Sequence, residues 1–272
     1  MARLMTGPGP HPAIRARVRG RSPLIGTFLN LGSALAAEAC ALAGFDWLLV
    51  DLEHGGRGED GLLGQLLAGA AHDVPVLVRV ESDSRIRAGR VLDAGASGVM
   101  FPRLESVEEV ATAVRHLHYP PQGDRGVATY NRSCGFGLAP EMLERSGSLI
   151  VAAIQIETLA ALDSVEEIAR VPGVDVLFVG PRDLSHALGI PGQMDHPTFR
   201  EALGRVSRAA EAAGVAAGIL AGSAEAAARY ADEGFTFLAV GSDSTSLATA
   251  ARGTVQGFRA ALAGAHAASS RP

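Results

Sequence analysis

Two carboxylates and an imidazole, Asp51, Glu53 and His54, lie close together in the stretch VDLEHGG at residues 50–56. They follow an apolar run, so a strand with a buried character ends in groups that transfer protons. A carboxylate beside one ring nitrogen of a histidine fixes its tautomer and raises the basicity of the other nitrogen. Asp51 can reach the ring only if the chain turns, which the following glycine pair permits. A lone histidine is more often a core or surface residue, but this spacing favours His54 as a general acid or base.

Two further carboxylates, Glu157 and Asp183, each follow a nearly continuous apolar run. On neighbouring strands they would repel each other, and the chain contains no lysine to neutralise them. A divalent cation removes such repulsion, and hard oxygen ligands favour Mg²⁺ or Mn²⁺. Each carboxylate could instead cap the helix that follows it or pair with an arginine. The spacing alone leaves the metal site and these structural roles open.

Arg79 and Asp93 occupy positions that fit either a structural or a chemical role. Arg79 ends the run VPVLVR, where its guanidinium can join a structural ion pair or face a carboxylate or a developing oxyanion. Asp93, in the stretch VLDAGA, falls at the end of an expected helix. A negative charge there opposes the helix dipole, which hints at a further role for this carboxylate.

The elements that must position these residues are short apolar runs alternating with longer, alanine-rich amphipathic stretches. The runs predict strands at 24–30, 47–53, 74–80, 98–104, 149–157, 174–181, 215–220 and 235–243. The other stretches predict helices at 33–44, 60–72, 84–94, 106–117, 160–170, 197–213, 223–233 and 246–262. Continuous runs of Val, Ile and Leu suit strands buried on both faces of a parallel sheet. This alternation predicts a single-domain α/β protein with a (β/α)₈ TIM barrel, and a doubly wound open sheet is the alternative.

In such a barrel the C-terminal ends of all strands meet at one mouth, where the active site lies. The expected strand ends carry polar residues at 51, 53, 54, 79, 103, 155, 157, 183 and 243. The barrel therefore predicts that residues far apart in sequence form one site. The segment 119–148 is long, rich in Gly and Pro and weakly periodic. Loops of this length are uncommon unless they are functional, so we expect an active-site loop.

Composition and charge exclude several classes of protein. The 272 residues are 47% apolar and carry a net charge of −5, so we expect a sizeable core and no nucleic-acid partner. No apolar run reaches the roughly 18 residues that span a membrane, and no secretory signal is evident. Two cysteines without metal or redox spacing favour a reducing, cytoplasmic location. Without lysine, a Schiff base with a carbonyl substrate or with PLP cannot form.

The domain boundaries follow from the same patterns. Residues 1–22 are locally rich in arginine and predict a flexible basic arm, residues 23–265 predict the barrel, and residues 266–272 predict a flexible tail. No long linker and no short-period repeat divides the chain.

A set of motifs, in order along the chain, resembles the class II pyruvate aldolases of the HpcH/HpaI family, which act on 2-keto-3-deoxy and 4-hydroxy-2-oxo acids. The matching stretches, from about residue 25 to 250, are GTFLNLGS, GFDWLLVDLEHGG, VPVLVRV, VLDAGASGVMFPRLESVEE, YPPQGDRG, IQIET, VDVLFVGPRDLSHALGIPG and GSDSTSL. DLEHG or QIET alone would be a weak signal, whereas their occurrence in this order with FVGPRDLS is specific.

The resemblance implies a (β/α)₈ lyase that assembles as a homo-hexamer. Such an enzyme joins pyruvate to an aldehyde through a metal-stabilised enolate, or cleaves the resulting 4-hydroxy-2-oxo acid. The resemblance also implies a divalent metal, Mg²⁺, Mn²⁺ or Co²⁺, with neither PLP nor a Schiff-base lysine.

The motifs of the family also imply roles for individual residues. The implied metal ligands are Glu157 and Asp183. The residues implied to bind the pyruvyl moiety are Gln155, Gly180, Pro181, Arg182 and Asp183, with Arg182 and Asp183 acting through their backbone. The implied catalytic residues are His54 as general acid and base, Asp51 to orient it, Asp93 to tune its basicity, and Arg79 to stabilise the enolate.

Two departures from the family pattern bear on the substrate. Many relatives carry a proline soon after the arginine where this chain has RVES, and small residues are common at the position of Arg182. The first bears on the loop after the third strand, and the second on the width and charge of the mouth. Two alternative functions stay open: a lyase of the malyl-CoA or citramalyl-CoA kind, and a non-catalytic barrel that binds a keto acid.

Overall fold

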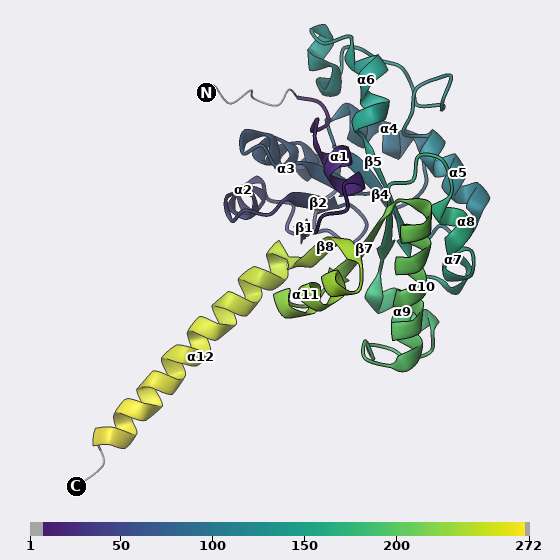
Figure 1. The fold of residues 1–272 in the computed structure, drawn as a ribbon. Helices are drawn as coiled ribbons and strands as arrows, with labels where there is room; N and C mark the ends of the chain where they lie inside the picture. The colour runs from purple at the N-terminus through teal and green to yellow at the C-terminus, as the bar shows by residue number, and fades with distance from the viewer. Residues whose placement is uncertain (1–7, 270–272) are drawn as a thin grey trace.

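Eight parallel strands form the centre of the computed structural model, which describes residues 8–269 (Figure 1). The strands are β1 (Leu24–Leu29), β2 (Trp47–Asp51), β3 (Val76–Arg79), β4 (Gly98–Phe101), β5 (Val151–Ile156), β6 (Val176–Val179), β7 (Ala216–Ala221) and β8 (Phe235–Ser242). Each strand pairs with the next and β8 pairs with β1, so the sheet closes. The predicted α/β barrel is confirmed, and the open sheet is excluded.

The helices around the barrel begin largely where the sequence predicts. They are α1 (Ile14–Arg19), α2 (Ala34–Leu42), α3 (Glu59–Ala71), α4 (Arg85–Asp93), α5 (Val107–Arg115), α6 (Met142–Leu149), α7 (Leu159–Asp163), α8 (Val165–Ala169), α9 (Pro181–Ala187), α10 (Pro197–Ala213), α11 (Ala224–Asp232) and α12 (Asp243–Ser269), with a 3₁₀ helix η1 (Arg132–Gly137). Ser106 and Glu109 form the reciprocal capping box of α5. The short helix α9 was not expected, because its first residue directly continues the apolar run of β6.

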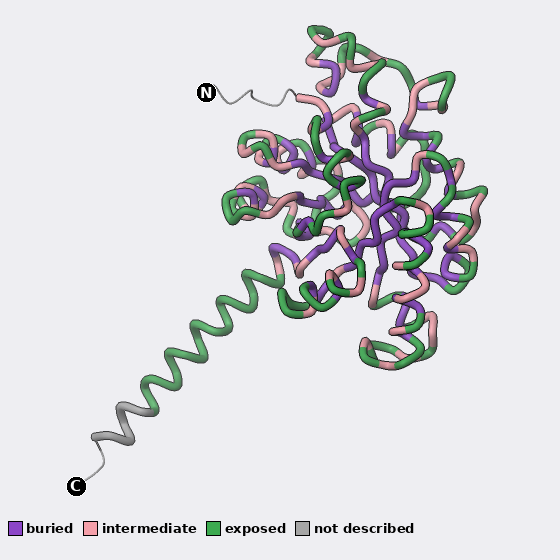
Figure 2. The backbone as a smooth tube through the Cα atoms, viewed as in Figure 1, coloured by how far each residue is buried: buried purple, intermediate pink, exposed green. Residues whose placement is uncertain are grey.

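Two apolar layers hold the barrel together. Inside it, the ring of Trp47 stacks on that of Phe237 with centroids 3.9 Å apart. The second layer, of Val, Leu, Ile and Ala, lies between the strands and the helices. Figure 2 shows that the buried backbone follows the strands. Because both faces of each strand are buried, the strands are continuous apolar runs in the sequence and do not alternate with polar residues.

The expected flexible arm at residues 1–22 differs from the structure, because residues 14–19 form helix α1. Ile14 lies one turn from Val18, and both are buried with the residues that fill the barrel interior. Arg15 and Arg19 each donate through Nε to the fully buried Asp175, at 2.9 and 2.8 Å. Apolar burial and this pairing fix the helix against the barrel. Residues 1–7 lie outside the described residues.

The segment 119–148 does not lie at the mouth of its own barrel. It connects α5 to β5, and a connection from a helix to the next strand runs at the N-terminal end of the barrel. Its second half forms η1 and α6, and Arg15 of α1 donates to the carbonyl of Gly147 in α6. The expectation of an active-site loop is therefore not met within one chain.

Helix α12 leaves the barrel. Its start contacts β1, β8 and α2, and the rest extends away from the other elements (Figures 1 and 2). It is helical to Ser269, so the tail expected at 266–272 is largely helix, and residues 270–272 lie outside the described part of the chain. No helix within residues 8–269 has both the length and the apolar character needed to cross a bilayer.

Candidate active site

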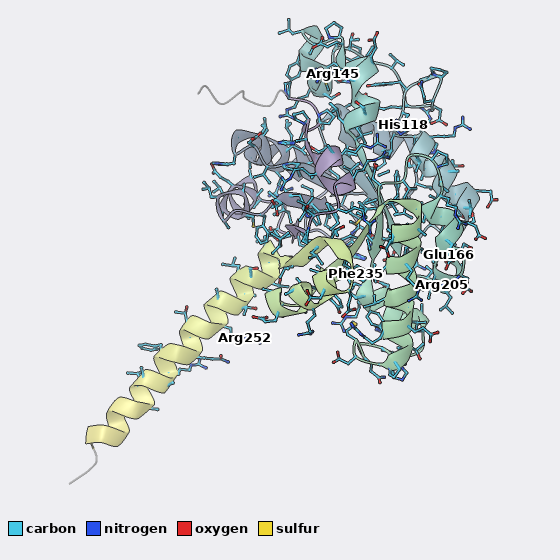
Figure 3. All side chains as sticks on the ribbon, in the orientation of Figure 1. His118, Arg145, Glu166, Arg205, Phe235 and Arg252 are labelled. Atoms are coloured by element: carbon cyan, nitrogen blue, oxygen red, sulfur yellow. The ribbon has the colours of Figure 1, made fainter. Side chains whose placement is uncertain are left out.

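The C-terminal ends of the strands surround a cavity of about 600 Å³, a size typical of small-molecule sites. The predicted site residues that line it are Asp51, His54, Arg79, Gln155, Pro181 and Arg182. A larger cavity of about 1040 Å³ lies at the opposite end, beside His118 (Figure 3). None of the polar strand-end residues lines that larger cavity, so we assign the chemistry to the mouth.

An ion pair between Asp51 and Arg79 forms the floor of the site. The register of β2 and β3 sets the two residues side by side. Arg79 donates from Nε to Asp51 Oδ1 at 2.9 Å and from Nη2 to Oδ2 at 2.7 Å. The two side chains are 10% and 1% exposed. Burial alone would raise the pKa of Asp51, but the hydrogen bonds and charge of Arg79, together with backbone hydrogen bonds from His54 and Glu53, outweigh it and hold that pKa below its usual range.

The guanidinium of Arg79 has further neighbours that fix its position. Its Nη1 lies 3.1 Å from Glu53 Oε2 and donates to Gln155 Oε1 at 3.4 Å. Its central carbon lies 5.3 Å from the centre of the Phe28 ring. A guanidinium carries five N–H donors, and these contacts do not exhaust them. Arg79 can therefore also bind an oxygen atom of a ligand in the cavity.

Asp51 supports the turn after β2 but does not contact the imidazole of His54. Asp51 Oδ1 accepts hydrogen bonds from the backbone N–H groups of Glu53 and His54, at 3.1 and 3.2 Å. Asn30 donates from Nδ2 to Asp51 Oδ2 at 2.8 Å. A Cβ at Gly55 would lie 2.0 Å from the Asp51 carbonyl oxygen, so this turn requires glycine. Asp51 therefore orients His54 through its backbone.

The ring of His54 stands at the edge of the cavity. Its side chain is 67% exposed, and Nε2 lies 3.8 Å from Glu53 Oε2. Glu53 thus links two groups of the site, because the same carboxylate oxygen lies 3.1 Å from Arg79. An exposed imidazole beside a carboxylate can exchange protons with both a ligand and solvent.

Glu157 is a buried carboxylate with neighbours of the same charge. It is 4% exposed, and its oxygens accept hydrogen bonds from Gln155 Nε2 at 3.0 Å and from the backbone N–H of Arg103 at 2.9 Å. Burial, with added repulsion from Asp183 and Glu53, raises its pKa to about 6. The negative charge at this position therefore lacks sufficient compensation from the protein.

Asp183 lies in the first turn of α9 and is exposed, and it is close enough to Glu157 for its charge to raise the pKa of that carboxyl. Gly180 is the N-cap of that helix, and a Cβ there would lie only 2.6 Å from Glu157 Oε2, so a larger residue would force the Glu157 carboxylate to shift. No group of three or more His, Cys, Asp and Glu side chains in the described part of the chain is arranged to hold a metal. Mg²⁺, however, is usually held by one or two carboxylates and keeps several waters. The uncompensated charge and the oxygen donors therefore fit Mg²⁺ or Mn²⁺, which need few protein ligands.

The structure does not bring Asp93 to the other predicted residues. It is the last residue of α4, at the N-terminal end of the barrel. Its Oδ1 accepts a hydrogen bond of 2.6 Å from Nη2 of the buried Arg125. This ion pair offsets the unfavourable interaction of the Asp93 charge with the helix dipole. In a single chain Asp93 and His54 lie at opposite ends.

Sequence reasoning missed several residues of the cavity. Asn30, directly after β1, positions Asp51, and the strand-end rule could have found it. Met194 and Tyr230 form part of the outer wall, but they come from a loop and from α11, where no sequence signal marks them. Asp243 does not line the cavity, since its Oδ1 accepts the backbone N–H of Asn30 at 2.8 Å and ties the end of β8 to that of β1.

Comparison with known proteins shows which proteins the chain is similar to. A relative from Paraburkholderia phytofirmans, named hydroxypyruvate/pyruvate aldolase, is 42% identical over 252 residues, covering 90% of this chain and 97% of the relative. A 5-keto-4-deoxy-D-glucarate aldolase from Klebsiella pneumoniae is 38% identical over 229 residues, covering 84% of this chain and 90% of that protein.

One solved structure aligns with this chain over nearly the whole length of both proteins. The crystal structure of an HpcH/HpaI aldolase/citrate lyase family protein from Burkholderia cenocepacia matches with a TM-score of 0.87 at 40% identity, covering 91% of this chain and 99% of that chain. The family model described as HpcH/HpaI aldolase/citrate lyase matches residues 24–250. As the motifs predicted, the chain belongs to the HpcH/HpaI aldolase/citrate lyase family.

Proposed function

We propose that the chain is a class II aldolase that joins pyruvate to an aldehyde, or cleaves a 4-hydroxy-2-oxo acid to the same compounds, with a divalent cation. One observation carries this proposal: contacts run from Asp51 through Arg79 and Gln155 to Glu157. They place a fixed guanidinium near Glu157, a buried carboxylate that forms no ion pair with any described residue. The aldolase names of the relatives and the family membership support a carbon–carbon lyase.

Glu157 and Asp183 would hold the cation, Mg²⁺ or Mn²⁺, through carboxylate oxygens. When bound, such a cation supplies Lewis-acid stabilisation of negative charge on a keto oxygen. Gln155 lies between this pair and Arg79, because its amide oxygen accepts from Arg79 and its amide nitrogen donates to Glu157. Gln155 thereby sets the position of both groups around a keto acid.

Arg79 would hold the charge that develops when pyruvate loses a C3 proton. Its contacts with Asp51 and Glu53 fix it before any substrate arrives, so little reorganisation is needed in the transition state. Its remaining N–H group, on Nη2, would face the carboxylate or the enolate oxygen of the substrate. A lysine could not hold both oxygens of Asp51 and also contact Gln155, because it lacks the planar fork.

His54 would transfer the protons. The ring removes a C3 proton of pyruvate, and its protonated form later donates to the alkoxide formed when the enolate carbon attacks the aldehyde. Its position at the cavity edge allows both steps, since the side chain reaches the solvent as well as the cavity. In the cleavage direction the same ring accepts the proton of the 4-hydroxyl group.

Proton exchange on pyruvate tests this proposal without the aldehyde. In D₂O with Mg²⁺ or Mn²⁺, the protein should replace the C3 protons of pyruvate by deuterium, as measured by proton NMR, and EDTA should abolish this exchange. The substitution His54→Ala should slow the exchange by roughly 10²- to 10⁴-fold, the usual contribution of a general acid or base. Circular dichroism would confirm that the variant is folded.

His72→Ala is the matched control. His72 follows α3 at the other end of the barrel, 3.1 Å from Glu38, and its loss should leave the exchange rate unchanged. A wild-type rate in His54→Ala would remove His54 from the mechanism. If the wild-type protein with metal gave no exchange, the proposed function would be wrong.

We also propose that the chain assembles into a homo-oligomer, with the hexamer of the family as the expected state. Val255, Phe258 and Leu262 are exposed on α12 at helical spacing, so they share one face of a helix that leaves its own barrel (Figure 2). A second copy could cover this face. The role proposed for Asp93 needs such an assembly too, because it reaches a His54 only across an interface.

Breaking this face should reduce the size of the assembly. The double substitution Val255→Asp and Phe258→Asp should lower the molar mass measured by light scattering after size-exclusion chromatography, because buried unpaired carboxylates oppose association. Gln256→Asp places one such charge on another face of the helix and should leave the mass unchanged. An unchanged mass in the double variant would exclude this face from the interface.

A further inference from the structure

Arg182 stands at the rim of the mouth cavity as the second residue of α9. It is exposed, whereas Arg79 on the floor of the same cavity is paired with two carboxylates. Within the described part of the chain, no carboxylate oxygen lies within ion-pair distance of Arg182. The cavity therefore has a compensated cation at its floor and an uncompensated one at its rim.

The position of Arg182 is fixed by the loop that follows α9. The buried Ser185 donates from Oγ to the Arg182 carbonyl at 2.7 Å and accepts the backbone N–H of Gly192 at 3.0 Å. A Cβ at Gly192 would lie 3.6 Å from Arg182 Nη1, so the guanidinium lies beside this turn. Both Arg182 and Gly192 line the cavity, which places the cation on its outer wall.

The rest of the outer wall offers no competing charge. Met194, Leu220 and Tyr230 contribute apolar side chains, and Ala221 and Gly222 leave space between them. The charged groups Asp51 and Arg79 lie deeper, where a keto acid would bind. A second substrate held between this floor and the rim would meet an apolar wall and one free guanidinium, which is complementary to an aldehyde with an anionic end.

We infer that Arg182 selects acceptor aldehydes that carry a carboxylate, an inference that rests on the proposed aldolase function. The C3 carbon of the pyruvate enolate bonds to the aldehyde carbon, the alkoxide takes up one proton, and the product is a 4-hydroxy-2-oxo dicarboxylic acid. The guanidinium pairs with the carboxylate that does not react, because its fork matches carboxylate geometry. The side chain of Arg182 touches no reacting atom and acts on specificity alone, and the substitutions below leave its backbone in place.

Matched pairs of aldehydes test this selection. Condensation with pyruvate is measured for glyoxylate against glycolaldehyde and for succinic semialdehyde against butanal, each pair differing in the carboxylate. The wild-type protein should prefer the anionic member. Arg182→Ala should lower kcat/KM for the anionic aldehydes by roughly tenfold, mainly through KM, and leave the neutral ones within a factor of about two, since an exposed ion pair is partly screened.

Two further variants sharpen the result. Arg182→Glu should disfavour anionic aldehydes more strongly than the alanine variant does. Arg208→Ala removes an exposed arginine of α10 that does not line the cavity, and should leave the preference in both pairs unchanged. Added KCl should reduce the wild-type preference and have little effect on that of Arg182→Ala.

Deuterium exchange at C3 of pyruvate distinguishes a failure of the inference about Arg182 from a failure of the proposed aldolase function. If the wild-type protein exchanges deuterium but neutral aldehydes react as well as anionic ones, the inference about Arg182 is overturned and the aldolase proposal stands. Equal losses for both members of each pair in Arg182→Ala also overturn it, because they indicate a general structural role. A wild-type protein without metal-dependent exchange overturns the inference together with the proposed function.

Discussion

The substitution Arg79→Lys should lower the rate of deuterium exchange at C3 of pyruvate by roughly 10²- to 10³-fold, the loss expected when one fixed donor to a developing oxyanion is removed. Lysine keeps the positive charge beside Asp51, so the buried carboxylate is not left without a partner. It cannot reproduce two parallel hydrogen bonds to Asp51 and a third contact to Gln155. Proton NMR in D₂O with Mn²⁺ or Mg²⁺ measures the loss.

A second bidentate arginine pair provides the control for this change. Arg205 on α10 donates from Nε and Nη2 to the two oxygens of Glu166 on α8, each at 2.9 Å, on the outside of the barrel (Figure 3). Arg205→Lys breaks the same geometry away from the mouth and should leave the exchange rate unchanged. If Arg79→Lys exchanged at the wild-type rate while folded, Arg79 would have only a structural role.

The location of the site could be predicted from the sequence, whereas its contacts could not. Asp51, Arg79 and the pair of Gln155 and Glu157 end three separate apolar runs, and a closed parallel barrel must bring such ends together. The sequence cannot show the register of the strands, and it is the register of β2 against β3 that pairs Asp51 with Arg79. The contact expected between Asp51 and the ring of His54 is for this reason a contact with the backbone instead.

The structures of the two terminal segments depend on contacts with other parts of the fold, which a local sequence pattern does not reveal. The arginine-rich stretch before β1 resembles a solvated arm, because its partner Asp175 lies about 160 positions away. Yet Asp175 is a charged residue beside the apolar run of β6, and a buried carboxylate requires a cationic partner. In α12 the helical period predicted the helix but not its direction, since packing against a neighbour decides whether a helix covers its own barrel.

The position of segment 119–148 could have been found from the order of the elements alone. It follows an expected helix and precedes an expected strand, so in a barrel it must lie at the N-terminal end. Its length and composition suggested function, but those features do not indicate which end of the barrel a loop occupies. Topology therefore outweighs composition when a long loop is placed.

The substitution Glu157→Gln should weaken the binding of Mn²⁺ by at least roughly 100-fold, measured by isothermal titration calorimetry or by electron paramagnetic resonance of the free ion. It removes one of the two proposed charged ligands and leaves Asp183 alone. In the wild-type protein, protons compete with the metal for a carboxylate whose pKa is about 6. Mn²⁺ affinity should therefore fall about tenfold per pH unit below this value, and this dependence should disappear in the variant.

The same carboxylate should also make the stability of the metal-free protein depend on pH, in the opposite direction: metal affinity rises with pH, whereas stability falls. The pKa of Glu157 is about 6 in the folded protein and 4.5 ordinarily, so the folded state binds the proton more tightly. The contribution of this group to the free energy of unfolding is fully present below pH 4.5 and is lost as the pH rises through 6. The loss is about 2 kcal/mol of unfolding free energy, measurable by urea denaturation, and saturating Mn²⁺ should offset it.

Glu166→Gln is the matched control, because it neutralises a carboxylate that pairs with Arg205 outside the barrel. That variant should bind Mn²⁺ with wild-type affinity and keep its dependence on pH, whereas Glu157→Gln should lose both. Since exchange on pyruvate should require the metal, Glu157→Gln should recover part of its activity at high Mn²⁺ concentration, through occupancy alone. Wild-type affinity in Glu157→Gln would show that the carboxylate is not a ligand, and its raised pKa would then reflect burial and repulsion without a metal site.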